Sequence, residues 1–138
     1  IRKMTVYALG ALPGDEQIST LRTALNDSVP DVQWNAAVAL ARHGNTQGVG
    51  ILGRMLDREY VERVAEPTMG VGSDEVDRVG EVMITGLNAI AALNANSFRD
   101  SVLQLSRQDE SLRVRQAAIE ALAVFDAADD RPEGRVRR

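Results

Sequence analysis

Cysteine is absent from this chain of 138 residues, and lysine and histidine occur once each, as Lys3 and His43. The absence of cysteine excludes disulfides, cysteine-ligated zinc sites and thiol nucleophiles. Acidic residues outnumber basic ones by 20 to 16, which gives a formal net charge of −4. This balance argues against a nucleic-acid surface, because phosphate contacts need clustered lysine and arginine.

Aromatic residues make up only 4% of the chain, whereas apolar residues make up 44%. The interior must therefore be built from Ala, Val, Leu and Ile, which suits closely stacked helices. No apolar run approaches the length of a membrane span, and no signal peptide is visible. We expect a soluble protein without a membrane contact in this chain, either cytoplasmic or periplasmic, because the lack of cysteine does not distinguish the two compartments.

One stretch of sequence occurs twice without a gap, as DSVPDVQWNAAVAL at Asp27–Leu40 and as DESLRVRQAAIEAL at Asp109–Leu122. A third, partial copy at Ile1–Leu12 aligns with Val32–His43. Self-similarity of this kind indicates a repeat architecture, in which each unit of about thirty residues is a first helix (A), a turn, a second helix (B) and another turn. Because Ile1 falls on Val32, we expect the native protein to continue upstream.

Turn and cap residues predict where the helices begin and end. Pro13-Gly14 ends the first A helix, and Ser28-Val29-Pro30-Asp31 resembles a capping box before the second. The second B helix is expected from about Thr46 to about Ala65, although it contains three glycines. Each glycine costs a helix roughly 1 kcal/mol relative to alanine, so we interpret them as sites of close helix packing or, alternatively, of approach by a partner's backbone.

An acidic insertion within residues 57–81 interrupts the repeat. Aligning Leu40 with Leu93 makes this unit about 22 residues longer than the others. The range contains eight acidic residues and three arginines, so the acidity of the chain is concentrated there. Beyond it we predict a third B helix that begins with a capping box at Ser97, a final A helix over residues 111–127, and a disordered tail over residues 128–138.

The V-R-x-A-A-x-x-A-L pattern at Val114–Leu122, its degenerate copy at Val32–Leu40 and the Ala-Leu pairs at residues 8–9 and 92–93 resemble HEAT repeats, most closely the short bacterial type of phycobilisome lyase subunits. The resemblance implies an all-α fold, a right-handed α–α superhelix of about three and a half helix pairs over residues 1–127, with B helices lining a concave face that binds a partner. Gln33 departs from this pattern, because an arginine is usual there, which puts an Asp–Arg ladder in doubt at that unit.

Few residues could carry catalysis. His43 aligns with the apolar Leu12 and Phe125 and is interpreted as a half-buried side chain near the carbonyl groups at the end of its helix, rather than as a catalytic base. A single histidine also excludes the iron sites that some HEAT enzymes form from repeated His-Glu pairs. Asp74, with Glu75 and Asp77, lacks EF-hand spacing and is interpreted as a solvated helix start. We therefore expect that the protein is not an enzyme and that it binds neither a metal nor a cofactor.

The resemblance favours a non-catalytic scaffold for an unidentified protein partner, bound through the B helices or the insertion. Trp34 aligns with the polar Lys3 and Gln116, so we expect it near the outer surface, either as an interface anchor or packed under the insertion or an upstream repeat. The candidate B-helix contacts are Gln17, Thr20, Arg22, Thr23, Gln47, Gly50, Arg54, Gln104, Arg107 and Gln108. The candidate contacts in the insertion are Tyr60, Met69, Asp74 and Asp77.

Two other interpretations follow from the resemblance and from the apparent truncation. The first is an accessory subunit of an enzyme such as a bilin-lyase-like complex, although a tetrapyrrole pocket should be richer in aromatic residues than this chain. The second concerns assembly, because a truncated solenoid exposes an apolar end and can associate end to end with itself.

Overall fold

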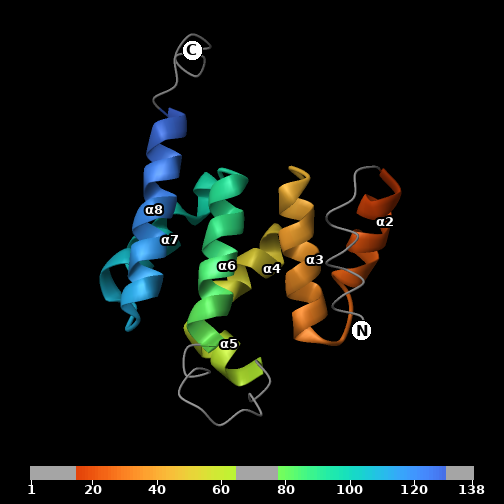
Figure 1. The fold of residues 1–138 in the computed structure, drawn as a ribbon, viewed down its shortest axis with the longest axis horizontal. Helices are drawn as coiled ribbons and strands as arrows, with labels where there is room; N and C mark the ends of the chain where they lie inside the picture. The colour runs from red at the N-terminus through yellow and green to blue at the C-terminus, as the bar shows by residue number, and fades with distance from the viewer. Residues whose placement is uncertain (1–14, 65–77, 130–138) are drawn as a thin grey trace.

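The computed structural model describes residues 15–64 and 78–129, and within these residues it contains helices and no strand. Three helices in the A positions, α3 (Pro30–Arg42), α6 (Arg78–Ala92) and α8 (Leu112–Asp129), stand side by side, with α3 packed on α6 and α6 on α8 (Figure 1). The B positions are taken by α2 (Asp15–Ala24), α4 (Val49–Met55) and α7 (Arg99–Gln108). Each B helix packs on an A helix, so the described chain is an all-α helical-repeat solenoid.

The core lies between the A and B helices and uses small side chains where the backbones approach closely. Ala36 and Ala37 of α3 are buried, and a Cβ added to Gly48 would lie 2.8 Å from the Ala37 Cα. A Cβ on Gly86 of α6 would lie 2.8 Å from the Met55 Cβ of α4. These contacts explain how a chain with few aromatic residues fills its interior, since its helices approach closely enough to leave no space for large side chains.

The A helices α3 and α6 end in the same way. Gly44 follows α3 with a φ of 72°, and the Asn45 N–H donates to the Leu40 carbonyl at 2.9 Å. Asn94 follows α6 with a φ of 52°, and the Ala95 N–H donates to the Ile90 carbonyl at 3.1 Å. Both ends are Schellman motifs, which require a left-handed residue that Gly or Asn adopts most easily.

The shared helix end corrects the repeat alignment. Ile90 is completely buried and occupies the place of Leu40, whereas Leu93 is only half-buried. The alignment of Leu40 with Leu93 is therefore wrong, and the interruption is about three residues shorter than it implied. The Ala-Leu pair at residues 92–93 misled the alignment because another small-apolar pair, Ala89-Ile90, lies one helical turn earlier.

Neither predicted capping box forms. Val29 is the N-cap of α3 and Phe98 that of α7, and neither cap makes a side-chain hydrogen bond. The turn before α3 is held one residue earlier than expected, where the Asp27 Oδ1 accepts the Val29 N–H at 2.8 Å. Proline does occupy the first turn of α3, as predicted. A 3-10 helix over Asn96–Phe98 precedes α7 and displaces Ser97 from the cap position.

The second B helix is broken, contrary to the expectation that it continues to about Ala65. It ends at Met55, and a separate helix α5 (Arg58–Val64) follows it at the lower end of α6 (Figure 1). The Asp57 Oδ1 accepts the N–H groups of Glu59 and Tyr60, at 3.1 and 3.3 Å, so this carboxylate begins a new helix rather than extending the old one.

The final A helix reaches Asp129, two residues past the Ala127 expected. The first A helix over residues 1–12, most of the acidic insertion and residues 130–138 of the tail lie outside the described residues.

Candidate binding face on the B helices

Two grooves flank α4 on the B-helix side of the solenoid. The first groove, between α2 and α4, has a volume of about 540 Å³, and Leu25 and Ile51 form its apolar part. Two arginines, Arg22 and Arg54, come from the last turns of α2 and α4 and are exposed. The other residues that line it are uncharged: Asn26, Gln33, Gln47 and Gly50.

The second groove lies between α4, the start of α5 and α7, and its volume is also about 540 Å³. It has the opposite charge, because its described lining residues include three acidic ones, Asp57, Glu59 and Asp109, and one cation, Arg58. Its other lining residues are Gly53, Leu56, Ser101, Gln104, Leu105 and Gln108. The B-helix face therefore changes from basic to acidic across α4.

Arg58 and Asp109, which both line the second groove, form an ion pair. The Arg58 Nε donates to the Asp109 Oδ1 at 3.1 Å, and an NH2 group donates to the Oδ2 at 2.7 Å. The side chains are only 18% and 3% exposed, so the two-point contact is shielded from water. The Ser111 N–H adds a bond to the Asp109 Oδ2 at 2.9 Å, which connects the pair to the start of α8.

The ionisation of this pair follows from its surroundings. Burial by itself raises the pKa of Asp109, but hydrogen bonds from Arg58 and Ser111, with the charges of Arg58 and Arg115, outweigh it and lower the pKa below its usual range. The hydrogen bond to Asp109 raises the pKa of Arg58. Both groups are therefore charged at neutral pH, and Arg58 is fully engaged within the protein.

The glycines of the second B helix serve two different purposes. A Cβ on Gly48 would lie 2.8 Å from the Ala37 Cα, so the backbones of α3 and the segment before α4 approach closely there. A Cβ on Gly53 would lie 2.6 Å from the Phe98 Cε1, so Gly53 leaves space for the Phe98 ring. Gly50 is exposed, and nothing lies within 4 Å of a Cβ added there. The packing interpretation is thus confirmed at Gly48 and Gly53, whereas Gly50 leaves a bare stretch of α4 open beside the first groove.

The grooves contain six of the ten B-helix residues singled out from the sequence. Arg22, Gln47, Gly50 and Arg54 line the first groove, and Gln104 and Gln108 line the second. The other four lie on the same helices but outside both grooves: Gln17, Thr20 and Thr23 on α2, and Arg107 on α7.

In the insertion, Tyr60 is half-buried and packs against the core, and Met69, Asp74 and Asp77 lie outside the described residues.

Sequence reasoning missed the acidic residues of the second groove as contributors to the B-helix face. Asp57 follows the buried Leu56 closely, much as Asp27 follows Leu25, and both carboxylates accept an N–H two residues further on. That local likeness was available in the sequence. The contact between Arg58 and Asp109 joins residues 51 positions apart, and no periodicity predicts it.

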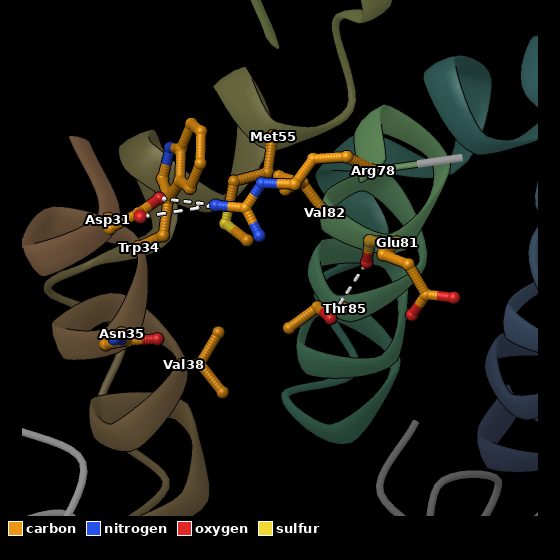
Figure 2. Close-up of a pocket in the computed structure, with 9 residues that line it drawn as sticks. All are labelled: Asp31, Trp34, Asn35, Val38, Met55, Arg78, Glu81, Val82 and Thr85. Atoms are coloured by element: carbon orange, nitrogen blue, oxygen red, sulfur yellow. Dashed lines mark hydrogen bonds and ion pairs between the residues drawn. The ribbon is translucent and has the colours of Figure 1, made fainter. Parts of the chain in front are cut away.

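A third hollow, of about 300 Å³, opens between α3 and α6 and corrects the placement of Trp34 (Figure 2). Trp34 is only 4% exposed and belongs to the core with Met55 and Val82, so the expected position near the outer surface is wrong. Beside it, an Arg78 NH2 group donates to both carboxylate oxygens of Asp31 at 3.2 Å, which ties α6 to α3. Trp34 lines the same hollow as Arg78 and Glu81, which stand at the end of the predicted insertion, while residues 65–77 of the insertion lie outside the described residues.

The His43 Nε2 is buried and has no hydrogen-bond partner among the described residues. Residues 15–64 and 78–129 contain no cluster of three His, Asp or Glu side chains that could hold a metal ion. None of the helices in these ranges combines the length and apolar character of a membrane span.

Comparison with known families supports the repeat architecture. The family model described as HEAT repeats matches residues 1–69, which is half of the chain. Searches of curated proteins and of solved structures each found no match.

Proposed function

Because the chain belongs to the HEAT-repeat family, we propose that it is a non-catalytic scaffold that holds a protein partner on its B-helix face. HEAT repeats generally mediate protein–protein interaction, and stacked repeats create extended surfaces suited to it. The observation that carries the proposal is the pair of grooves on either side of α4, each about 540 Å³. Their lining residues include side chains from each of the three described B helices, α2, α4 and α7.

The composition of the grooves favours a polypeptide over a flat cofactor. Among the described residues, no aromatic side chain lines either groove. A tetrapyrrole pocket would need apolar and aromatic walls around most of the ligand, whereas these grooves are open and rich in amides and charges. This composition supports a scaffold rather than an accessory subunit that handles a bilin.

The absence of cysteine allows a direct test of the face. A Gly50→Cys variant introduces a single thiol beside the first groove, where an added Cβ meets nothing within 4 Å. A bulky maleimide on that thiol should block the face without disturbing the core. An Asn88→Cys variant is the matched control, because Asn88 is an exposed residue of the A helix α6 and can be labelled in the same way.

The measurement is affinity capture from native lysate with labelled and unlabelled forms of both variants. We expect a partner that binds unlabelled Gly50→Cys and labelled Asn88→Cys but not labelled Gly50→Cys. A partner that binds labelled Gly50→Cys equally well would place the interaction elsewhere. Capture of nothing by the unlabelled forms would count against a scaffold role for these repeats.

A further inference from the structure

The first groove has two exposed arginines that no described residue neutralises. Arg22 and Arg54 come from different helices, and neither forms an ion pair among the described residues. Cations at the last turn of a helix are favoured by the helix dipole, which accounts for each arginine separately. It does not account for their convergence on one groove whose described lining residues include no carboxylate.

The substitution of Gln33 for the usual arginine contributes to this arrangement. The Gln33 Nε2 donates to the Asp27 carbonyl oxygen at 2.6 Å and lines the groove as a neutral group. In the last unit, the corresponding Arg115 acts on Asp109 and helps to lower its pKa. With glutamine at this position, the side chain that lines the groove together with Arg22 and Arg54 is uncharged.

The second groove has the opposite character. Asp57 and Glu59 are exposed and form no ion pair with a described residue. Arg58, the one cation among the described lining residues, is held by Asp109. Among the described residues, the Asp57 carboxylate accepts hydrogen bonds only from the backbone N–H groups of Glu59 and Tyr60. A cation from outside is therefore favoured in the second groove, and an anion in the first.

From this pairing we propose that the B-helix face binds an extended segment of a protein partner in one direction, with an Asp or Glu side chain in the first groove and a Lys or Arg side chain in the second. This inference rests on the proposed function and specifies the chemistry of its partner. The segment crosses α4 beside Gly50, where the absence of a side chain leaves room for a peptide backbone.

The spacing of the two charges follows from helix packing. Neighbouring packed helices are about 8–10 Å apart, so grooves on either side of one helix have a similar separation. An extended chain of the polyproline II type covers about 3.1 Å per residue and returns every third side chain to the same face, so the acidic and basic side chains of the partner should lie about three residues apart. A nucleic acid does not fit this pattern, because its uniform phosphate charge would be repelled by Asp57 and Glu59.

The test screens a display library of random peptides of about twelve residues for binding to the full chain. The peptides kept are those that bind unlabelled Gly50→Cys but no longer bind this variant once its thiol carries the maleimide. We expect the selected peptides to share an acidic and a basic residue about three positions apart. Their affinity should fall at least about tenfold for an Arg22→Glu, Arg54→Glu double variant. Arg22→Glu and Arg54→Glu made singly should each weaken binding, whereas Arg113→Glu on α8, which changes the net charge by the same amount and lies outside both grooves, should leave it unchanged.

Restoration separates a charge contact from a loss of folding. Changing the acidic residue of a selected peptide to lysine should weaken binding to the native chain and recover it with the double variant. Label-sensitive peptides without the charge pattern, or without dependence on Arg22 and Arg54, would overturn this inference and leave the binding face intact. Peptides that bind regardless of the label, or no peptides at all, would overturn both. Competition by a single-stranded DNA oligonucleotide that depends on Arg22 and Arg54 would replace the peptide with a phosphate ligand.

Discussion

Replacing Arg58 with alanine should destabilise the protein far more than breaking any exposed ion pair. The substitution removes two hydrogen bonds, at 3.1 and 2.7 Å, from a carboxylate whose side chain is only 3% exposed. Asp109 would keep the Ser111 N–H and would remain buried with most of its charge uncompensated. The variant is therefore expected to lose stability chiefly because an unpaired charge stays in the interior.

The magnitude follows from that burial. Breaking a buried ion pair by removing one partner costs about 3–5 kcal/mol. Because the Ser111 N–H and the charge of Arg115 still stabilise the Asp109 carboxylate, Arg58→Ala should lose about 3 kcal/mol of stability, the lower end of this range. For a chain of this length, this corresponds to a fall in Tm of about 10 °C.

A second, exposed ion pair serves as the control that separates the effect of burial on stability from the effect of the contact distance. Arg113 and Glu81 form a shorter contact, 2.6 Å, but their side chains are 59% and 57% exposed. Arg113→Ala should therefore cost at most about 1 kcal/mol, because water screens the pair. Distance alone would predict the reverse order.

Urea unfolding monitored by circular dichroism gives both free energies of unfolding. A double-mutant cycle with Arg58→Met and Asp109→Asn isolates the coupling between the two groups. If Arg58→Ala loses no more stability than Arg113→Ala, the assignment of the Arg58–Asp109 pair as a buried structural contact is wrong.

Three further outcomes can be measured in the same way. The pKa of Asp109 is lower in the folded state than in the unfolded state, so the stability that Asp109 contributes is complete above its unfolded pKa and is lost as the pH falls from about 4 through the folded value. The difference in free energy of unfolding between the native chain and Asp109→Asn should therefore shrink on acid titration. Gly50→Ala should stabilise the protein by about 0.5–1 kcal/mol, whereas Gly48→Ala should destabilise it, because its Cβ would lie 2.8 Å from backbone; equal effects in thermal melts would refute the packing argument. Asn94→Gly should be nearly neutral and Asn94→Ala should cost about 1 kcal/mol, since φ is 52° there, and a neutral alanine variant would contradict the left-handed helix end.

The sequence alone was sufficient for the architecture, because the repeat acts locally. Apolar residues at helical spacing, Val32, Ala36 and Leu40, are buried in α3, and the equivalents Val114 and Ala118 are buried in α8. Pro30 at the first turn of α3 and Gly44 just beyond its end carry their own backbone preferences. Such signals extend over a few residues, so they can be read without knowing what lies on the other side of the molecule.

The candidate site could be predicted only in part from the sequence. Helical phase placed Arg22, Gln47 and Arg54 on one face, and the structure shows that they line one groove. Phase could not show that Trp34 is covered, because its burial depends on the position of α6 after an interruption of the repeat. A polar equivalent such as Gln116 is exposed on α8, while the same position on α3 is enclosed.

Tertiary structure alone decided the charge pattern of the binding face. The second groove is acidic because Asp57 and Glu59, which follow α4, meet Asp109 at the end of α7. Arg58 contributes no free cation there because Asp109, 51 residues away, binds it in two places. The sequence determined which helices form, since propensity, capping and periodicity are local properties. Which charges meet and which remain available depends on contacts between distant segments, and those exist only once the helices have stacked.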